Sequence, residues 1–417
     1  MVMEQEIRVQ AEAAKAASYR LAALRTDARN KALCAMADAL MAHRDTILHE
    51  NAADVEDAKT SGIRASYLDR LHLDEARITS MAEGLRLTAA LPDPLGREDY
   101  SVRRPNGLEI RRMRVPLGVA GIIYEARPNV TADAIGLCLK AGNAVLLRGG
   151  SDALRSNLAI AEVLSRAAYA AGIPQGAIQL LAMKERAAVD VMIHLTGLLD
   201  VIIPRGGAGL IRRIVENSTV PVIETGAGVC HIYVDCAADL SMALRIVENA
   251  KVSRPSVCNA AETLLVHEKI AEEFLPQMAQ LLHADGVELR GCPKTCAILS
   301  DIVPASEEDW STEYGDLILS IRMVTDMETA IAHINQYNTG HSETIVTNDI
   351  RAAHDFQQCV DASTVYVNAS TRFTDGFEFG FGAEIGISTQ KLHVRGPMGL
   401  EALTSTKYLV YGEGQVR

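Results

Sequence analysis

The sequence predicts an α/β protein that contains two domains built on parallel β-sheets. The chain has 417 residues, which is too long for one ordinary core. Apolar residues make up 48% of it and aromatic residues only 4%, which favours helices packed on a sheet over a β-sandwich. Short apolar runs alternate with helix-period segments from residue 116 to about residue 375, as in repeated β-α-β units.

The first 90 residues are predicted to be helical. Residues 4–90 carry apolar side chains at helical spacing and include no convincing strand. Two or three helices fit this pattern, with breaks near Asn51 and at the Ser61-Gly62 pair. The opening segment is an amphipathic helix without the apolar core of a signal peptide, so we expect no export signal.

A linker rich in Pro and Gly at 91–96 leads into a predicted hairpin at 101–115. Asn106-Gly107 lies between two extended runs and is typical of a two-residue hairpin turn. Arginines crowd this hairpin at positions 103, 104, 111, 112 and 114. Two interpretations stay open: a charged edge that blocks aggregation, and a contact between subunits.

The alternating pattern from 116 to 235 predicts a domain of the dinucleotide-binding plan. Its strands are expected at 118–125, 143–149, 177–182, 199–206 and 221–228. Its helices include 131–140 and 152–171. A second α/β domain follows, with strands expected at 231–235, 262–267, 318–324, 342–347 and 363–368.

These patterns divide the chain into three parts. Residues 1–225 form the first domain, with 101–115 as an oligomerisation element, and residues 226–375 form the second. Residues 376–417 are a Gly-rich segment that ends in a predicted strand and packs back on the body or on another subunit.

Charge and cysteine content narrow the functional classes. The net charge of -12 argues against nucleic acid or anionic membranes as main partners. No run of about 18 apolar residues occurs, so we expect no membrane span and a cytoplasmic location. The eight cysteines are expected to be reduced, mostly as small core residues. Cys292 and Cys296 have no second Cys/His pair at zinc-finger spacing, so no metal site is expected.

One cysteine lies in a different setting. Cys258 follows Pro255 and Ser256 and precedes small residues, so its loop can expose a thiol. A nucleophilic thiolate needs nearby positive charge or backbone donors, and Lys251 and Arg254 are close enough in sequence to supply charge.

Three strand ends carry further candidate residues. Glu224 is expected at the end of an apolar strand before Thr-Gly-Ala-Gly, where α/β sheets open toward ligands. Those glycines permit close backbone approach or simply make turns. Arg-Gly-Gly ends two other strands, at 148–150 and 205–207, and each can form an anion site with the helix that follows. Neither has the G-x-G-x-x-G spacing.

The order and spacing of these segments resemble the aldehyde dehydrogenase superfamily. Its members carry a Glu in an E-L-G-G type motif and the nucleophilic Cys about 34 residues later, and here Cys258 follows Glu224 by 34 residues. Longer segments resemble, more narrowly, the family of reductases that act on L-glutamyl 5-phosphate. They are 124–134, 139–157, 220–235, 254–267 and 379–403, and the resemblance runs over essentially the whole chain.

The resemblance implies the two-domain aldehyde dehydrogenase fold and the second step of proline biosynthesis. NADPH would reduce L-glutamyl 5-phosphate to L-glutamate 5-semialdehyde through a thioacyl intermediate on Cys258, with release of phosphate. Thiolate suits this reaction because it attacks well and leaves well. A homo-oligomer is implied, and the glutamate kinase that makes the substrate is a candidate partner.

The resemblance also assigns roles to residues. Asn129 would donate to the oxyanion together with the N–H of Cys258. Glu224 would position the nicotinamide or transfer a proton, because water attack would waste the thioester. Arg254 and Asn259 are the candidates for substrate binding. The cofactor-binding candidates are Arg148, Gly149, Gly150, Ser151, Arg205, Gly206, Gly207 and Glu313. An Arg at 148 also suits the 2′-phosphate of NADPH.

Three other functions stay open at this point. The nearest is a hydrolytic or CoA-acylating aldehyde dehydrogenase with the same Cys and cofactor. A second is a non-catalytic protein that retains the fold, which the Cys, the Glu and the Gly-bearing strand ends argue against. The third, nucleic-acid binding through the arginine hairpin, fits the acidic net charge poorly.

Overall fold

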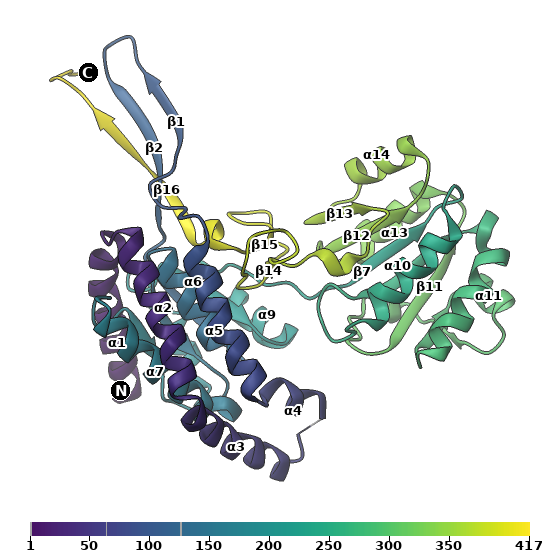
Figure 1. Ribbon diagram of the computed structural model, residues 1–417. Coiled ribbons are helices and arrows are strands. Elements are labelled where there is room, and N and C mark those ends of the chain that lie inside the picture. Colours follow the sequence, from purple (N-terminus) through teal and green to yellow (C-terminus); the bar gives the residue numbers. More distant parts are fainter. Residues whose placement is uncertain (1, 64, 126) are drawn as a thin grey trace. The chain divides into compact units, whose positions relative to one another are not determined.

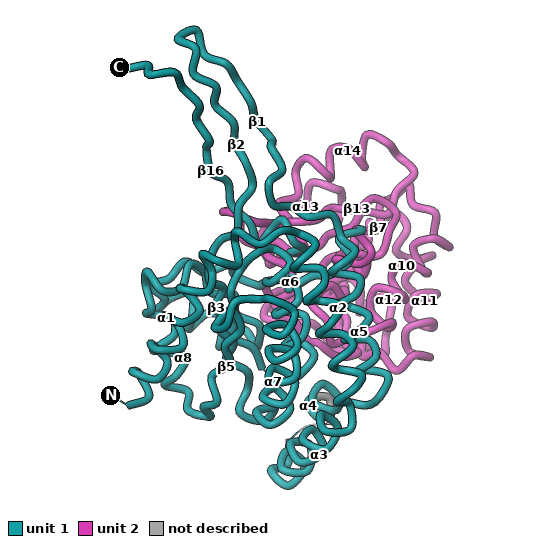
Figure 2. The backbone as a smooth tube through the Cα atoms, turned by 60° about the vertical axis from the view of Figure 1, so that its left-hand side comes forward, with its two compact units in different colours: residues 1–225, 380–386, 398–417 teal, residues 226–379, 387–397 magenta. Residues whose placement is uncertain are grey.

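The computed structural model of the protein describes residues 2–63, 65–125 and 127–417 (Figure 1). Contacts between residues divide the chain into two compact units, which Figure 2 colours separately. Unit 1 comprises Met1–Thr225, Gly380–Gly386 and Met398–Arg417, and unit 2 comprises Gly226–Phe379 and Ile387–Pro397. The segment 376–417, which the sequence suggests is one element, contributes to both units.

Helices fill the first 90 residues, as predicted, but their boundaries differ. They are α1 (Val2–Ala22), α2 (Thr26–Ala42), α3 (Arg44–Thr60), α4 (Ala65–Leu71) and α5 (Glu75–Ala90). The break expected at Ser61-Gly62 is confirmed, since α3 ends there. The break expected near Asn51 is wrong: Asn51 lies inside α3, where its amide donates to the carbonyl of Leu71 at 2.9 Å. The break between α2 and α3 falls at His43, where no Gly or Pro marks it.

A parallel sheet with the strand order β5-β4-β3-β6 forms the centre of unit 1. Its strands are β3 (Val119–Tyr124), β4 (Ala144–Arg148), β5 (Ile178–Leu180) and β6 (Val201–Arg205). The helices after them are α6 (Asn129–Lys140), α7 (Leu154–Ala170), α8 (Ala187–Met192) and α9 (Ala208–Asn217). Strands β3 to β5 proceed in one direction and β6 lies on the other side of β3. Ligands of such sheets bind at this reversal, beyond the carboxyl ends of the strands.

The strand expected at 221–228 is wrong. Val222 forms an isolated bridge with Ile202 in place of a regular ladder. The N–H of Ile202 donates to the carbonyl of Pro221 at 2.8 Å, but the ladder does not continue, because Pro204 on β6 has no N–H to donate to the next carbonyl. Glu224 therefore lies in an irregular extended segment that continues to the start of unit 2.

The arginine hairpin is confirmed, and the C-terminal strand extends it into an antiparallel sheet of order β1-β2-β16 (Figure 1). These strands are β1 (Glu98–Arg103), β2 (Glu109–Pro116) and β16 (Thr404–Tyr411). The predicted two-residue turn is wrong. The N–H of Arg104 donates to Leu108 at 2.8 Å and encloses three residues, Pro105 to Gly107. A two-residue type I′ turn needs a positive φ at Asn106, which Asn106 does not adopt.

A second parallel sheet, of order β10-β9-β11-β8-β7-β12-β13, forms unit 2. Its predicted strands are confirmed as β7 (Cys230–Val234), β8 (Ala261–His267), β11 (Ile318–Val324), β12 (Ser342–Val346) and β13 (Thr364–Val367). Two short edge strands were not predicted: β9 (Glu288–Gly291) and β10 (Val303–Pro304). A small antiparallel pair joins β14 (Ile387–Ser388) and β15 (Gly396–Pro397).

Helices pack on both faces of this second sheet and bury its apolar side chains (Figure 1). They are α10 (Leu240–Val252), α11 (Glu268–Ala284), α12 (Pro293–Ile298), α13 (Met327–Tyr337) and α14 (Ile350–Cys359). Every residue of β8 is buried, and these include the polar side chains of Glu262, Thr263 and His267. In the described part of the chain, every helix is too short or too polar to cross a membrane.

Candidate functional site

Cys258 lies in a loop, residues 253–260, between α10 and β8 of unit 2. The residue is half-buried, and its carbonyl oxygen is closely packed. The thiol of Cys230 donates to this oxygen at 3.3 Å. A Cβ added to Gly228 would lie 1.5 Å from the same oxygen, so only glycine fits there. This glycine of the T-G-A-G motif approaches the backbone of the candidate nucleophile.

Asn259 anchors the Cys258 loop. Its amide nitrogen donates to the carbonyls of Arg372 and Thr374 at 3.2 and 3.0 Å. Its amide oxygen accepts from the guanidinium of Arg372, and its backbone carbonyl accepts from the hydroxyl of Thr371 at 2.7 Å. The side chain is buried and fully hydrogen-bonded within the protein, so the geometry favours a positioning role over the predicted substrate contact.

Arg372 is a neighbour of Cys258 that the sequence did not indicate. Its Nε donates to the hydroxyl of Ser253 at 3.1 Å, at the start of the Cys258 loop. Burial lowers the pKa of Arg372, and the charge of Arg254 lowers it further, whereas Asp375 and Cys258 act in the opposite direction. Arg254, the predicted substrate-binding residue, is exposed beside it. The structure therefore brings two arginines to the candidate nucleophile.

Lys251, which the sequence suggested as a source of charge for Cys258, has a carboxylate partner of its own. Its ammonium pairs with Glu262 at 2.6 Å, and both side chains are fully buried. Burial raises the pKa of Glu262 to about 7, although Lys251 opposes this shift. The other oxygen of Glu262 accepts from the N–H of Gly315 at 3.2 Å, so the pair links α10, β8 and the loop before β11.

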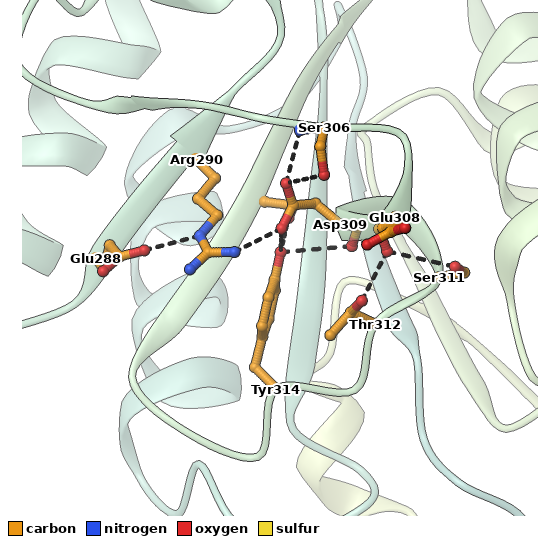
Figure 3. A network of polar contacts seen from close by, with 9 residues as sticks. Glu288, Arg290, Ser306, Glu308, Asp309, Ser311, Thr312 and Tyr314 are labelled. Atoms are coloured by element: carbon orange, nitrogen blue, oxygen red, sulfur yellow. Dashed lines mark hydrogen bonds and ion pairs between the residues drawn. The ribbon is translucent and has the colours of Figure 1, made fainter.

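Glu313 is held close to the Cys258 loop. One carboxylate oxygen of Glu313 accepts from the N–H of Gly228 at 3.0 Å. Its neighbour Tyr314 belongs to a polar network around Asp309 (Figure 3). The hydroxyl of Tyr314 and the guanidinium of Arg290 each donate to the Asp309 carboxylate, both at 2.7 Å. Burial alone would raise the pKa of Asp309, but these hydrogen bonds hold it well below its usual range. The network fixes the loop that carries Glu313.

A buried polar chain lies behind the Cys258 loop. Cys230 is 3.8 Å from His341 Nδ1, which is 2.8 Å from the hydroxyl of Ser342. Ser342 in turn lies 2.6 Å from the hydroxyl of Thr374. Burial raises the pKa of Cys230 well above its usual value and lowers the pKa of His341 to about 4. Cys230 is thus a neutral hydrogen-bond donor.

Two predicted catalytic residues belong to unit 1. Asn129 is the first residue of α6, where it is exposed and donates to Asp133 at 3.1 Å. Burial raises the pKa of Asp133 to about 6, against the effect of this hydrogen bond. Glu224 is half-buried, and its neighbour Thr225 is anchored to the carbonyl of Pro204 at 2.6 Å.

The predicted cofactor residues 148–151 lie where β4 ends and α7 approaches. Arg148 is buried and donates to the carbonyls of Gly149 and Lys184 at 3.0 and 3.2 Å, while its Nε has no partner in the described part of the protein. A Cβ added to Gly149 would lie 2.1 Å from the amide of Asn157, so the Asn157 side chain packs directly against this strand end and only glycine fits there. Gly150 and Ser151 lead into a short 3-10 turn, Ser151–Ala153, before α7.

The second Arg-Gly-Gly, at 205–207, lies between the end of β6 and the start of α9. Here the N–H of Gly207 donates to Glu125 at 2.9 Å, and Glu125 also lies against Gly206. The helix N-terminus that we expected to bind an anion therefore already faces a carboxylate. A phosphate would have to displace that carboxylate, because like charges repel each other.

Known proteins resemble this chain over nearly its whole length. The model of the aldehyde dehydrogenase family matches residues 2–288 and 295–408. A gamma-glutamyl phosphate reductase of Moorella thermoacetica is 60% identical over 412 residues, which are 99% of this chain and 99% of the relative. One of Caldanaerobacter subterraneus is 58% identical over 412 residues, which are 99% of this chain and 100% of the relative.

Solved structures extend the comparison. The crystal structure of gamma-glutamyl phosphate reductase from Thermotoga maritima is 50% identical, with a TM-score of 0.97, and the match covers 99% of this chain and 100% of that one. An acetylating aldehyde dehydrogenase from Geobacillus thermoglucosidasius is 19% identical, with a TM-score of 0.70 over 100% of this chain and 98% of that one, and shares the fold. The chain therefore belongs to the aldehyde dehydrogenase family and, within it, to the gamma-glutamyl phosphate reductases.

Proposed function

We propose that the protein catalyses the NADPH-dependent reduction of L-glutamyl 5-phosphate to L-glutamate 5-semialdehyde, with release of phosphate, in proline biosynthesis. The observation that carries this proposal is the environment of Cys258. The Cys258 loop of unit 2 combines a half-buried thiol with a closely packed backbone. Arg254 lies in this loop, and Arg372 is hydrogen-bonded to it. The relatives of 58–60% identity, named gamma-glutamyl phosphate reductases, support the same activity.

The chemistry follows from the thiol. The Cys258 thiolate attacks the acyl carbon, the bond from that carbon to the phosphate oxygen breaks, and a thioester remains on the enzyme. When bound by the residues of unit 1, the nicotinamide cofactor would supply the hydride that reduces the thioester. The thiohemiacetal then takes up a proton on sulfur as it collapses, which releases the aldehyde and restores the thiol. Backbone packing by Gly228 keeps the sulfur in one place through both steps, because it fixes the Cys258 carbonyl.

The cofactor would be held by residues of unit 1. Arg148 and Gly149, at the end of β4, are proposed for the phosphate-bearing half of NADPH, because the fork of an arginine matches a 2′-phosphate. Gly150 and Ser151 lie beside it at the approach to α7. Arg205, Gly206 and Gly207 are weaker candidates because Glu125 occupies the N–H of Gly207.

Three carboxylate and amide side chains complete the proposal. Asn129 is the proposed donor to the oxyanion, where the loss of one donor typically costs about 10²–10³ in rate. Glu224 would orient the nicotinamide or transfer a proton. Glu313, which accepts from the N–H of Gly228, would orient the nicotinamide ribose beside the thiol. The substrate would come from a glutamate kinase, which is also a candidate partner.

The test is the reverse reaction on purified protein. Glutamate semialdehyde and NADP⁺ are mixed with and without phosphate, and the reduced cofactor is followed by absorbance. We expect turnover that requires phosphate and that disappears in Cys258→Ala. Turnover without phosphate would move the assignment to a hydrolytic dehydrogenase, and turnover that requires coenzyme A would move it to a CoA-acylating enzyme. Equal activity with NAD⁺ would remove the proposed role of Arg148 in cofactor choice.

A further inference from the structure

The arrangement of Arg372 leaves part of its guanidinium available for a ligand. Nε is bonded to Ser253 and Nη1 to the side chain of Asn259, so two residues of the Cys258 loop hold the group in a fixed orientation. Nη2 donates no hydrogen bond to any protein atom in the described part of the chain. Arginine has five N–H donors, so the second N–H of Nη1 and both N–H groups of Nη2 remain for an anion.

Arg372 has a second arginine and one carboxylate near it. The positive charge of Arg254 acts on it, and the carboxylate nearby belongs to Asp375. That carboxylate already accepts from the N–H of Phe377 at 2.8 Å. Asp375 offsets one of the two positive charges, and an anion that bridges both arginines would offset the other.

The shape of the group indicates which anion fits. A guanidinium held by Nε and one Nη presents a planar edge that can bind two oxygens of one tetrahedral anion. Both arginines flank Cys258, one four residues before it and the other bonded to the residue after it. An acyl phosphate must place its phosphate beside the sulfur that attacks the carbonyl carbon.

We infer that Arg372, together with Arg254, binds the phosphoryl group of the acyl phosphate and then the inorganic phosphate that leaves. This inference rests on the proposed function and adds a residue that the sequence did not indicate. Ser253 and Asn259 are positioning residues in this inference, because their hydrogen bonds hold the guanidinium. In the reverse direction the same pair would deliver phosphate to the thioester.

The first measurement needs neither cofactor nor turnover. Cys258 is alkylated with iodoacetamide, and the modified peptide is quantified by mass spectrometry at rising concentrations of inorganic phosphate. Phosphate should slow the alkylation of the native protein in a saturable way. In Arg372→Gln the half-protecting concentration should rise about ten- to a hundredfold, as expected for the loss of charge-assisted hydrogen bonds. Arg245→Gln, an exposed arginine on α10, is the matched control and should behave like the native protein.

Kinetics separate phosphate binding from a structural role. In the reverse reaction Arg372→Gln should raise the KM for phosphate by the same factor, while the KM for the aldehyde changes less than threefold. Ser253→Ala retains the guanidinium but loosens it, so it should raise the KM for phosphate by a few fold and leave the alkylation rate without phosphate unchanged. A shift confined to the KM for the aldehyde, or unchanged protection by phosphate in Arg372→Gln, would overturn the inference.

These measurements distinguish a wrong reductase activity from a wrong phosphate site. If native turnover does not depend on phosphate, the proposed reductase activity is wrong. If native turnover depends on phosphate but Arg372→Gln retains the native KM and native protection, only the phosphate site is wrong. A third outcome would also overturn the site. If Arg372→Gln loses alkylation of Cys258 in the absence of phosphate, while phosphate still protects the fraction that reacts, then Arg372 has a structural role only.

Discussion

Replacing Gly228 by Ala tests whether the backbone of Cys258 is held as tightly as the structure indicates. The added Cβ would lie 1.5 Å from the Cys258 oxygen, 2.4 Å from its carbonyl carbon and 2.8 Å from its Cα. Non-bonded carbon and oxygen atoms need at least about 3 Å, so the carbonyl must move by about 1.5 Å or Gly228 must retreat by the same amount. All three obstructing atoms are backbone, so no side-chain rotation can relieve the contact.

The expected cost follows from that displacement. A misplacement of about 1 Å at a reacting group can reduce the rate about 10²-fold, so kcat in the reverse assay should fall at least that much. Overpacking should also reduce the free energy of unfolding by about 1–3 kcal/mol. Both quantities are measurable on one preparation, by cofactor absorbance and by urea unfolding.

A matched control separates the local clash from a general effect of Gly→Ala. Gly84 lies inside α5, and nothing lies within 4 Å of the position where its Cβ would be. Gly84→Ala should leave kcat unchanged and raise the free energy of unfolding by about 0.5–1 kcal/mol. If Gly228→Ala keeps kcat within threefold of the native value, the argument that this contact positions Cys258 is refuted.

Three further predictions concern stability and assembly. Lys251→Met leaves the buried carboxylate of Glu262 uncompensated and should reduce the free energy of unfolding by about 3–5 kcal/mol, measured by urea unfolding. A double variant that also carries Glu262→Leu should recover most of this free energy. The absence of any recovery would contradict the pairing. Burial raises the pKa of Asp133 to about 6, above its unfolded value, so its contribution to stability is present at low pH and is lost as pH rises through 6. The free energy of unfolding of Asp133→Asn, relative to that of the native protein, should therefore increase by about 1–2 kcal/mol as the pH rises from 4.5 to 7.5. A difference that does not depend on pH would disprove the shift. If the sheet β1-β2-β16 is a subunit contact, Tyr408→Asp on its exposed face should shift sedimentation toward the monomer, and a native protein that is already monomeric at micromolar concentration would exclude that role.

Several elements could be predicted because their signal is local. The parallel strands β3 and β4 are buried on both faces, so each forms a short apolar run with few polar interruptions. The irregular segment 221–228 also begins with apolar residues, Val222 and Ile223, yet it forms no ladder beyond them because Pro204 on the neighbouring strand has no N–H. Composition alone does not separate these two cases, because the difference lies in hydrogen-bond donors.

The sequence by itself determined the fold class, the family and the candidate nucleophile. Each of these depends on patterns along the chain, such as the interval from Glu224 to Cys258. Only the tertiary structure decided what surrounds that nucleophile. Strands β7 and β8 are parallel neighbours, so the residues that enter them, Gly228 and Cys258, come into contact. Arg372 reaches the same loop from 113 residues beyond Asn259, and no local pattern encodes such a contact, because strand order and side-chain packing create it.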